Sequence, residues 1–542
     1  MYTISNVYII ATVAVIGGGL FGFDISSMSA ILGTTSYKCY FNNNGFDENG
    51  MCRGPNPSVQ GGITAAMTAG SWLGALISGY LSDILGRRYA IMIGCVIWII
   101  GSAITCASQN IAMLVVGRLI NGLCVGIQSA QVPVYISECV PPTKRGRLVG
   151  LQQWAITWGI LILYYVSYGA SFVGGDQPDT YSEAVFRIPW GIQMVPGVLL
   201  LCFMIFMPES PRWLARKDRW EEAHRILTLI HGKGDPDSPL VQYEMNDIRE
   251  MCATEAMFAD VTYWELFYPK NIYRTHIGMF TQIWSQLTGM NVMMYYITYI
   301  FGMAGYSGSA NLLASSIQYI INVVMTVPAL IWMDKWGRRV PLIIGAFLMM
   351  TFMFANAGIM GGTGIVRPGG IDGVPQQSME VSGAPAQGLI ACTYLFVASY
   401  AITWGPISWV YPPEVYPQRV RGKAVALATS ANWAFNTALS AFVPEAFATI
   451  RWKVYIVFGV FNLCMLIHAA LLFPETAGKT LEQTQFMFED PNGIPYIGTP
   501  AWKTKKSTMD MAQVERGNVT VGPKDVDEKS MEETGTVEVK KE

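Results

Sequence analysis

Long apolar stretches separated by short polar breaks constrain this chain more than any other feature of its sequence. Twelve stretches are long enough to cross the membrane, since about 30 Å of hydrocarbon takes roughly 20 helical residues. In lipid the backbone must satisfy its own hydrogen bonds, so each stretch is predicted to be a helix. The predicted spans are residues 8–33, 58–82, 89–107, 111–137, 148–170, 189–207, 277–305, 311–333, 341–360, 387–413, 422–447 and 453–473.

The charged residues are concentrated outside these spans. Of the 74 Asp, Glu, Lys and Arg residues, 21 fall in residues 208–276 and 19 in residues 489–542, which leaves 34 for the other 419 positions. Globular domains are about 25% charged, whereas these 419 positions are only about 8% charged. The sequence therefore predicts an all-α membrane protein. Residues 208–276 are expected to form a linker with short helices near 218–231 and 244–257, and residues 489–542 a disordered tail.

Basic residues in the short loops predict the topology. The loops after even-numbered spans hold eleven Lys and Arg residues, and the opposite loops hold six. By the positive-inside rule, the richer side faces the cytosol. Both termini are therefore predicted to be cytosolic, in a multi-pass protein of the plasma membrane.

Several classes of protein are not supported. The net charge is −2 and the sequence has no stripe of basic residues, so it does not predict a surface that binds nucleic acid. We find no metal-ligand spacing, phosphate-binding loop or nucleophile elbow, so we expect no metal, no cofactor and no enzymatic activity. We also expect a monomer. Cys39 and Cys52, 13 residues apart in the first outer loop, could form a disulfide.

Three motifs occur in the same order in both halves of the chain. They are DILGRR at 83–88 and DKWGRR at 334–339, a Glu seven residues before Arg-Gly at Glu138 and Glu414, and Pro-Glu-Ser/Thr at 208–210 and 474–476. Each pair falls at the same end of corresponding spans. This repeat predicts two six-helix bundles of the same topology, residues 1–207 and 277–488, related by an axis along the membrane normal.

These motifs and four others are shared with a known family. The others are Gly117-Arg118, QLTGMN at 286–291, Gly405-Pro406 with Trp409, and PETAGKTLE at 474–482. The chain is therefore similar to sugar porters of the major facilitator superfamily, close to the fungal hexose transporters. The similarity extends from about Gly17 to Glu482. It implies the twelve-helix major facilitator fold and alternating access to a central sugar site.

Amide side chains inside the spans are candidates for binding a sugar. One amide both donates and accepts hydrogen bonds and has no charge to desolvate. Taken singly, such a residue could instead form an interhelical hydrogen bond. The family resemblance implies a sugar site formed by Gln153, Gln286, Asn291, Asn322 and Asn432, with Trp409 stacking on the sugar.

One position departs from the family pattern. Ser285 replaces the first of two adjacent glutamines that are common in the seventh helix, and Gln282 lies one turn earlier. Whether Gln282 reaches the same cavity is left open by the sequence.

Two opposite charges are predicted inside the N-terminal spans. Asp24 and Arg118 would each be costly if unpaired in lipid, so we interpret them as partners. Burial favours the neutral acid and a nearby guanidinium favours the carboxylate, so movement of Arg118 would switch the protonation of Asp24. This is the chemistry of proton coupling, although a purely structural pair is the alternative.

Two groups of residues are candidates for gating. Tyr295 and Tyr296 follow a Gly-interrupted helix and could close the outer side, or could simply pack. The charged motifs could form networks that break when the inner side opens, or could merely cap helix ends. These residues are Asp83, Arg87, Glu138, Arg145, Glu209, Arg212, Asp334, Arg338, Glu414 and Arg421.

Together these features predict an importer of a monosaccharide, hexose or glucose-like, whose partners are the sugar, a proton and the lipid bilayer. A facilitative uniporter and a non-transporting sugar sensor remain alternatives. The sequence does not distinguish sugars that differ by single hydroxyls.

Overall fold

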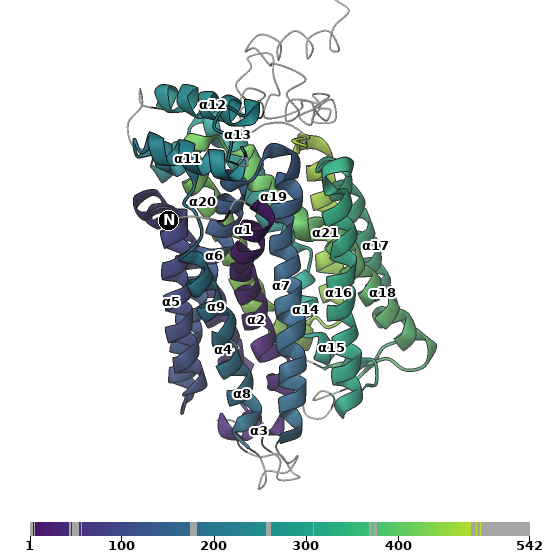
Figure 1. Cartoon of the computed structure of the whole chain (residues 1–542). Helices are drawn as coiled ribbons and strands as arrows, with labels where there is room; N and C mark the ends of the chain where they lie inside the picture. Colours follow the sequence, from purple (N-terminus) through teal and green to yellow (C-terminus); the bar gives the residue numbers. More distant parts are fainter. Residues whose placement is uncertain are drawn as a thin grey trace, which may run out of the picture.

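The computed structural model describes residues 4–488 except for residues 5, 43–44, 46–51, 53, 56, 174–181, 233, 256–261, 307, 368–370, 372–376, 478–483 and 485–487. The predicted tail, residues 489–542, lies outside the described residues. Long helices run side by side in a bundle, with short helices α11 and α12 across one end (Figure 1). We call this the linker end. The opposite end, where α3 lies, is called the disulfide end because Cys39 and Cys52 are bridged there, with Cα atoms 5.1 Å apart.

The helices before the linker are called the N-half. Several are interrupted, as at Val15 between α1 and α2 and at Gln193 between α8 and α9. The elements are α1 (Val7–Ala14), α2 (Ile16–Ser29), η1 (Ile31–Gly33), α3 (Thr35–Tyr40), α4 (Pro57–Leu85), α5 (Arg87–Cys106), α6 (Ile111–Cys139), α7 (Pro142–Ala170), η2 (Ser171–Val173), α8 (Ala184–Ile192) and α9 (Met194–Met204).

The linker and the second set of helices, called the C-half, complete the fold. The linker holds α10 (Pro211–Arg216), α11 (Trp220–Ile230), α12 (Pro239–Glu255) and η3 (Tyr263–Phe267). A two-residue antiparallel ladder, β1 (Ile365–Val366) with β2 (Met379–Glu380), is the only strand pairing among the described residues. The C-half helices are α13 (Pro269–Leu287), α14 (Met290–Tyr295), α15 (Ile297–Met303), α16 (Gly308–Trp336), α17 (Arg339–Thr363), α18 (Ala384–Ile402), α19 (Trp404–Val415), α20 (Gln418–Thr449) and α21 (Lys453–Leu472).

All the predicted spans coincide with helices, and the all-α membrane fold is confirmed. Within the described residues, nine segments are long and apolar enough to cross a membrane. The predicted spans 58–82, 277–305 and 422–447 are helical but more polar, being rich in Gly, Ser, Thr, Asn and Gln. Two of these more polar helices, α4 and α20, pack against each other across the two halves. Their small and polar residues therefore face protein rather than lipid.

The repeat is visible at the N-termini of α5 and α17, which begin in the repeated Gly-Arg-Arg sequences and are capped in the same way. Gly86 and Gly337 have positive φ angles of 98° and 85°, and a Cβ on either would lie 2.5 Å from a carboxylate oxygen of Glu209 or Glu475. Glu209 accepts the backbone N–H groups of Arg87 (3.0 Å) and Arg88 (3.2 Å). Glu475 accepts those of Arg338 (2.8 Å) and Arg339 (3.1 Å) in the same way. Each glutamate thus satisfies free amides at a helix N-terminus.

The linker helices are fixed to the N-half by a buried histidine. The Nε2 atom of His231 lies 3.1 Å from the carbonyl oxygen of Cys139, and its Nδ1 atom lies 3.0 Å from Glu244 of α12. Burial alone would lower the pKa of His231, but the Glu244 carboxylate raises it above its ordinary value. The ring is therefore protonated more readily than a free histidine, which strengthens its contact with Glu244.

Candidate functional site

A break in the seventh predicted span brings several amides together. α13 ends at Leu287, and Gly289 takes a left-handed conformation with φ 91° before α14 begins. The turn directs Asn291 back along the preceding helix, where its Nδ2 atom donates to Oε1 of Gln286. Gln286 in turn donates from Nε2 to Oδ1 of Asn432 in α20, at 3.0 Å.

Gln282 extends this arrangement. Asn432 donates from Nδ2 to Oε1 of Gln282 at 2.6 Å, and Gln282 donates to the carbonyl oxygen of Ser408 at 2.8 Å. Gln282 therefore belongs to the same hydrogen-bonded group, and its contact with a sugar stays a prediction. We call Asn291, Gln286, Asn432 and Gln282 the amide chain. Hydrogen bonds in such a chain polarise one another in a buried setting.

A second polar contact connects the two halves directly. The indole Nε1 of Trp409 in α19 donates to Oε1 of Gln153 in α7 at 3.0 Å. Trp409 is 5% exposed and Gln153 is 6% exposed. Two residues predicted for one site from opposite halves of the chain therefore meet in the interior.

Asn322 is the remaining residue of the predicted sugar site, and Ser285 is the position that departs from the family pattern. Asn322 in α16 is 1% exposed, and its Oδ1 atom has no hydrogen-bond partner among the described residues, so it can accept a hydrogen bond from a ligand. Ser285 lies 2.9 Å from the hydroxyl of Tyr400 in α18. Tyr400 is not among the residues predicted from the sequence, where its only signal is a hydroxyl in a span five residues before Gly405.

The predicted charge pair in the N-half is present but is held by a single contact. Nη2 of Arg118 lies 3.5 Å from Oδ2 of Asp24, and the side chains are 2% and 1% exposed. Oδ1 of Asp24 has no hydrogen-bond partner in the described part of the chain. Arg118 is also held by the carbonyl oxygen of Ile63 (3.0 Å) and the hydroxyl of Ser27 (3.4 Å). Asp24 therefore keeps one oxygen available for a proton without displacing the guanidinium.

The two predicted gate tyrosines lie in the short helix after the break and at its end. Tyr295 and Tyr296 are buried, and α14 packs against α2 of the N-half. The Tyr296 hydroxyl is 3.4 Å from the carbonyl oxygen of Ser440, and its ring stacks on Tyr299 with centroids 5.7 Å apart. These tyrosines therefore lie where the C-half packs against α2, the helix that carries Asp24.

The main ion pairs at the linker end each lie within one half. Arg87 binds Glu138 through two contacts of 3.0 and 3.1 Å, both within the N-half. Arg338 binds Glu414 through contacts of 3.2 and 2.8 Å, both within the C-half. These pairs therefore brace each half internally and need not break when the halves separate. Whether they break when the linker end opens stays a prediction.

The contact between the halves is made by other charges. Oδ2 of Asp83 lies 3.6 Å from Nζ of Lys423, while Asp83 is also 3.8 Å from Arg216 of the linker. Arg421 acts on Glu138 from the opposite half while donating to the carbonyl oxygen of Tyr416. Arg212 is buried in α10. The side chains of Arg145 and Asp334 lie outside the described residues.

We expect Lys423→Gln to favour opening at the linker end. The change removes the 3.6 Å contact with Asp83, and loss of a partly buried pair worth about 1 kcal/mol shifts a two-state equilibrium about fivefold. Reactivity of a cysteine placed inside the linker end measures this shift. The control is Lys453→Gln, an exposed lysine at the start of α21 near the disulfide end. Equal reactivity of both variants would contradict the assignment of this contact.

Comparisons with known proteins agree with this geometry. A family model for sugar (and other) transporters matches residues 10–488. The chain is 48% identical over 530 residues to an MFS glucose transporter of Aspergillus flavus, covering 96% of this chain and 97% of that protein. It is 46% identical to a high-affinity glucose transporter of Kluyveromyces lactis, covering 92% and 87%.

A solved structure shares the fold. The MFS proton:xylose symporter bound to 6-bromo-6-deoxy-D-glucose superposes with a TM-score of 0.73 at 26% identity, covering 90% of this chain and 100% of that one. The helices therefore adopt the fold of the major facilitator superfamily. This chain therefore belongs to the family of sugar (and other) transporters, which are not enzymes.

Proposed function

We propose that this protein imports a monosaccharide of the hexose class, glucose-like, together with a proton. The observation that carries the proposal is the meeting of Gln153 and Trp409 from opposite halves, 3.0 Å apart, in the same interior as the amide chain. The glucose transporters among its relatives and the proton:xylose symporter with the same fold support the substrate class and the coupling.

The amides can exchange their mutual hydrogen bonds for those of a sugar. Gln286 uses both its amide oxygen and its amide nitrogen within the chain, and every member can donate and accept. A sugar that inserts among them replaces one set of buried hydrogen bonds with another, so little polar surface is left unsatisfied. The Trp409 indole offers an apolar face for the ring of the sugar.

Alternating access follows from closures at both ends of the bundle. We propose that residues 1–207 and 277–488 move as two bodies joined by residues 208–276, in a monomer, with the linker end in the cytosol of a cell whose plasma membrane holds the protein. Asp83 and Lys423 close the linker end. Tyr295 and Tyr296, packed in and beside α14 against α2, close the disulfide end.

We expect Tyr295→Ala to hold the protein open at the disulfide end. The change removes a buried ring where α14 packs against α2, and loss of a large buried side chain costs about 3 kcal/mol or more. Reactivity of a cysteine facing the disulfide end is expected to rise and uptake to fall. Tyr306→Ala, an exposed tyrosine after α15, is the control. Unchanged reactivity and uptake in Tyr295→Ala would remove the gate assignment.

Uptake by vesicles or by cells that lack other sugar transporters tests the function as a whole. Glucose, galactose, xylose and small polyols are offered in turn while the external pH is recorded. Sugar uptake with alkalinisation of the medium supports symport. Uptake without a pH change indicates a uniporter, and binding without uptake indicates a sensor; either result would overturn the proposed coupling.

A further inference from the structure

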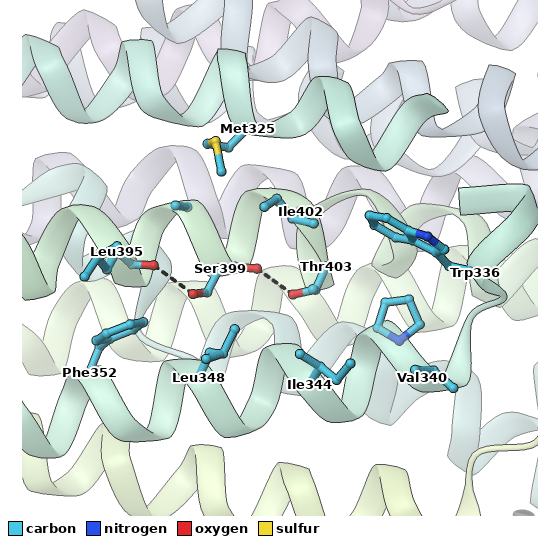
Figure 2. A pocket seen from close by; sticks show the side chains of 12 residues that line it. Met325, Trp336, Val340, Ile344, Leu348, Phe352, Leu395, Ser399, Ile402 and Thr403 are labelled. Carbon is cyan, nitrogen blue, oxygen red and sulfur yellow. Dashed lines mark hydrogen bonds between the residues drawn. The ribbon is translucent and has the colours of Figure 1, made fainter. Parts of the chain in front are cut away.

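The C-half carries an apolar groove of 620 Å³ between α16, α17 and α18, separate from the amide chain. Val340, Ile344, Leu348 and Phe352 of α17 lie along it at intervals of one turn, opposite residues of α18 (Figure 2). Residues spaced by four share one face of a helix. The groove opens outward, because Val340 and Ile344 are 53% and 51% exposed.

The two hydroxyls that line the groove both donate to backbone carbonyl oxygens of α18. The Ser399 hydroxyl donates to the carbonyl oxygen of Leu395 at 2.8 Å, and the Thr403 hydroxyl donates to that of Ser399 at 2.6 Å (Figure 2). The three helices are all among the apolar membrane-spanning segments. The groove is therefore surrounded by hydrocarbon, and it suits an apolar chain rather than a sugar.

The groove is about as long as one leaflet of a bilayer is thick, and the residues at one end of it are typical of the membrane interface. The stripe from Val340 to Phe352 extends about 18 Å at 1.5 Å per residue, close to half of a hydrocarbon core of about 30 Å. At the linker end lies Trp336, which is 45% exposed and stacks on Trp332 with ring centroids 5.5 Å apart. Tryptophan is enriched where hydrocarbon meets headgroups. Lys335, exposed in the last turn of α16, places a positive charge beside this end.

We propose that this groove binds one acyl chain of an anionic glycerophospholipid from the leaflet at the linker end. The chain lies along Val340 to Phe352, Trp336 is at the level of the glycerol backbone, and the anionic headgroup is next to Lys335. The lining residues follow one face of α17 for about 18 Å, a path that a single acyl chain can take, and the positive charge favours an anionic headgroup.

Photolabelling of the full-length protein in lipid vesicles tests this proposal. The probes are phosphatidylserine and phosphatidylcholine with the same photoactivatable acyl chain, and a photoactivatable sterol. Labelled peptides are mapped by mass spectrometry. Phosphatidylserine is expected to label the facing surfaces of α17 and α18. Lys335→Gln is expected to lower the ratio of phosphatidylserine to phosphatidylcholine labelling about fivefold, the equivalent of about 1 kcal/mol.

A matched pair of variants separates groove binding from ordinary contact with bulk lipid. Ala398→Phe fills the groove and is expected to remove most of the label. Ala391→Phe makes the same change on the same helix, about two turns away, at an exposed position outside the groove, and is expected to keep the label. Sugar uptake by both variants shows that they fold. Labelling that survives in Ala398→Phe, equal labelling by both phospholipids, or labelling by the sterol in their place would overturn the proposal.

Discussion

Asp24→Asn is expected to abolish accumulation of sugar against its gradient while leaving sugar exchange across the membrane intact. One proton crossing 100 mV supplies about 2.3 kcal/mol, which corresponds to about fifty-fold accumulation. Asparagine keeps the size of the side chain and can still contact Arg118, but it cannot carry a proton. The accumulation ratio should therefore fall close to unity, and the sugar-induced alkalinisation of the medium should disappear. Both are measured with labelled sugar and a pH electrode.

The unpaired Arg118 in this variant requires its own control. Removing one partner of a buried pair can destabilise a protein by about 3–5 kcal/mol, which could mimic a loss of coupling. The double variant Asp24→Asn with Arg118→Gln removes both charges and should restore stability without restoring accumulation. Asp235→Asn, an exposed aspartate of the linker, should behave like the unmodified protein. Accumulation and alkalinisation that persist in a folded Asp24→Asn protein would show that Asp24 does not carry the proton.

Gln286→Ala is expected to raise the half-saturating sugar concentration by about 10- to 100-fold, since unsatisfied buried polar groups cost about 1–3 kcal/mol each. Gln286 connects Asn291 to Asn432. Its removal leaves two buried amides without this partner and takes away a contact for the sugar. Sugar binding to the purified protein, measured by calorimetry, checks this expectation.

The matched control for this change is Gln128→Ala. Gln128 is also a buried glutamine within a span, but it donates to the carbonyl oxygen of Ile91 at 2.8 Å inside the N-half. Its loss should lower the melting temperature and leave sugar affinity unchanged. If Gln286→Ala changed stability but not affinity, the amide chain would be a structural brace rather than a sugar site.

The positions of the helices and the proximity of Gln153 and Trp409 could be predicted from the sequence for a physical reason. Apolar length alone predicts a spanning helix, and the repeat fixes the order of corresponding elements. The side-chain partners could not be predicted in the same way. The turn at Gly289 brings Asn291 into contact with Gln286. The orientation of α13 about its own axis brings Gln282 to Asn432. These side-chain contacts depend on the angles at which the helices pack, and the spacing of residues in the sequence does not determine those angles.

The charged residues show the same limit. The order of the motifs correctly indicated that Arg87, Glu138 and Glu209 lie near one another, as do Arg338, Glu414 and Glu475. It did not show that these contacts stay within one half, or that Lys423 makes the contact between halves. Lys423 follows the repeated Arg-Gly, as Arg147 does in the first half, but its contact with the opposite half is apparent only once α20 is seen to pack on α4.

The internal pairing of Arg87 with Glu138, and of Arg338 with Glu414, has a consequence for biogenesis. During synthesis the first arginine and its glutamate emerge from the ribosome and can neutralise each other long before the second pair has been translated. Chains generally fold unit by unit from the N-terminus during synthesis. Newly inserted early helices therefore do not have to wait for the C-half before the buried charges of Arg87 and Glu138 are neutralised.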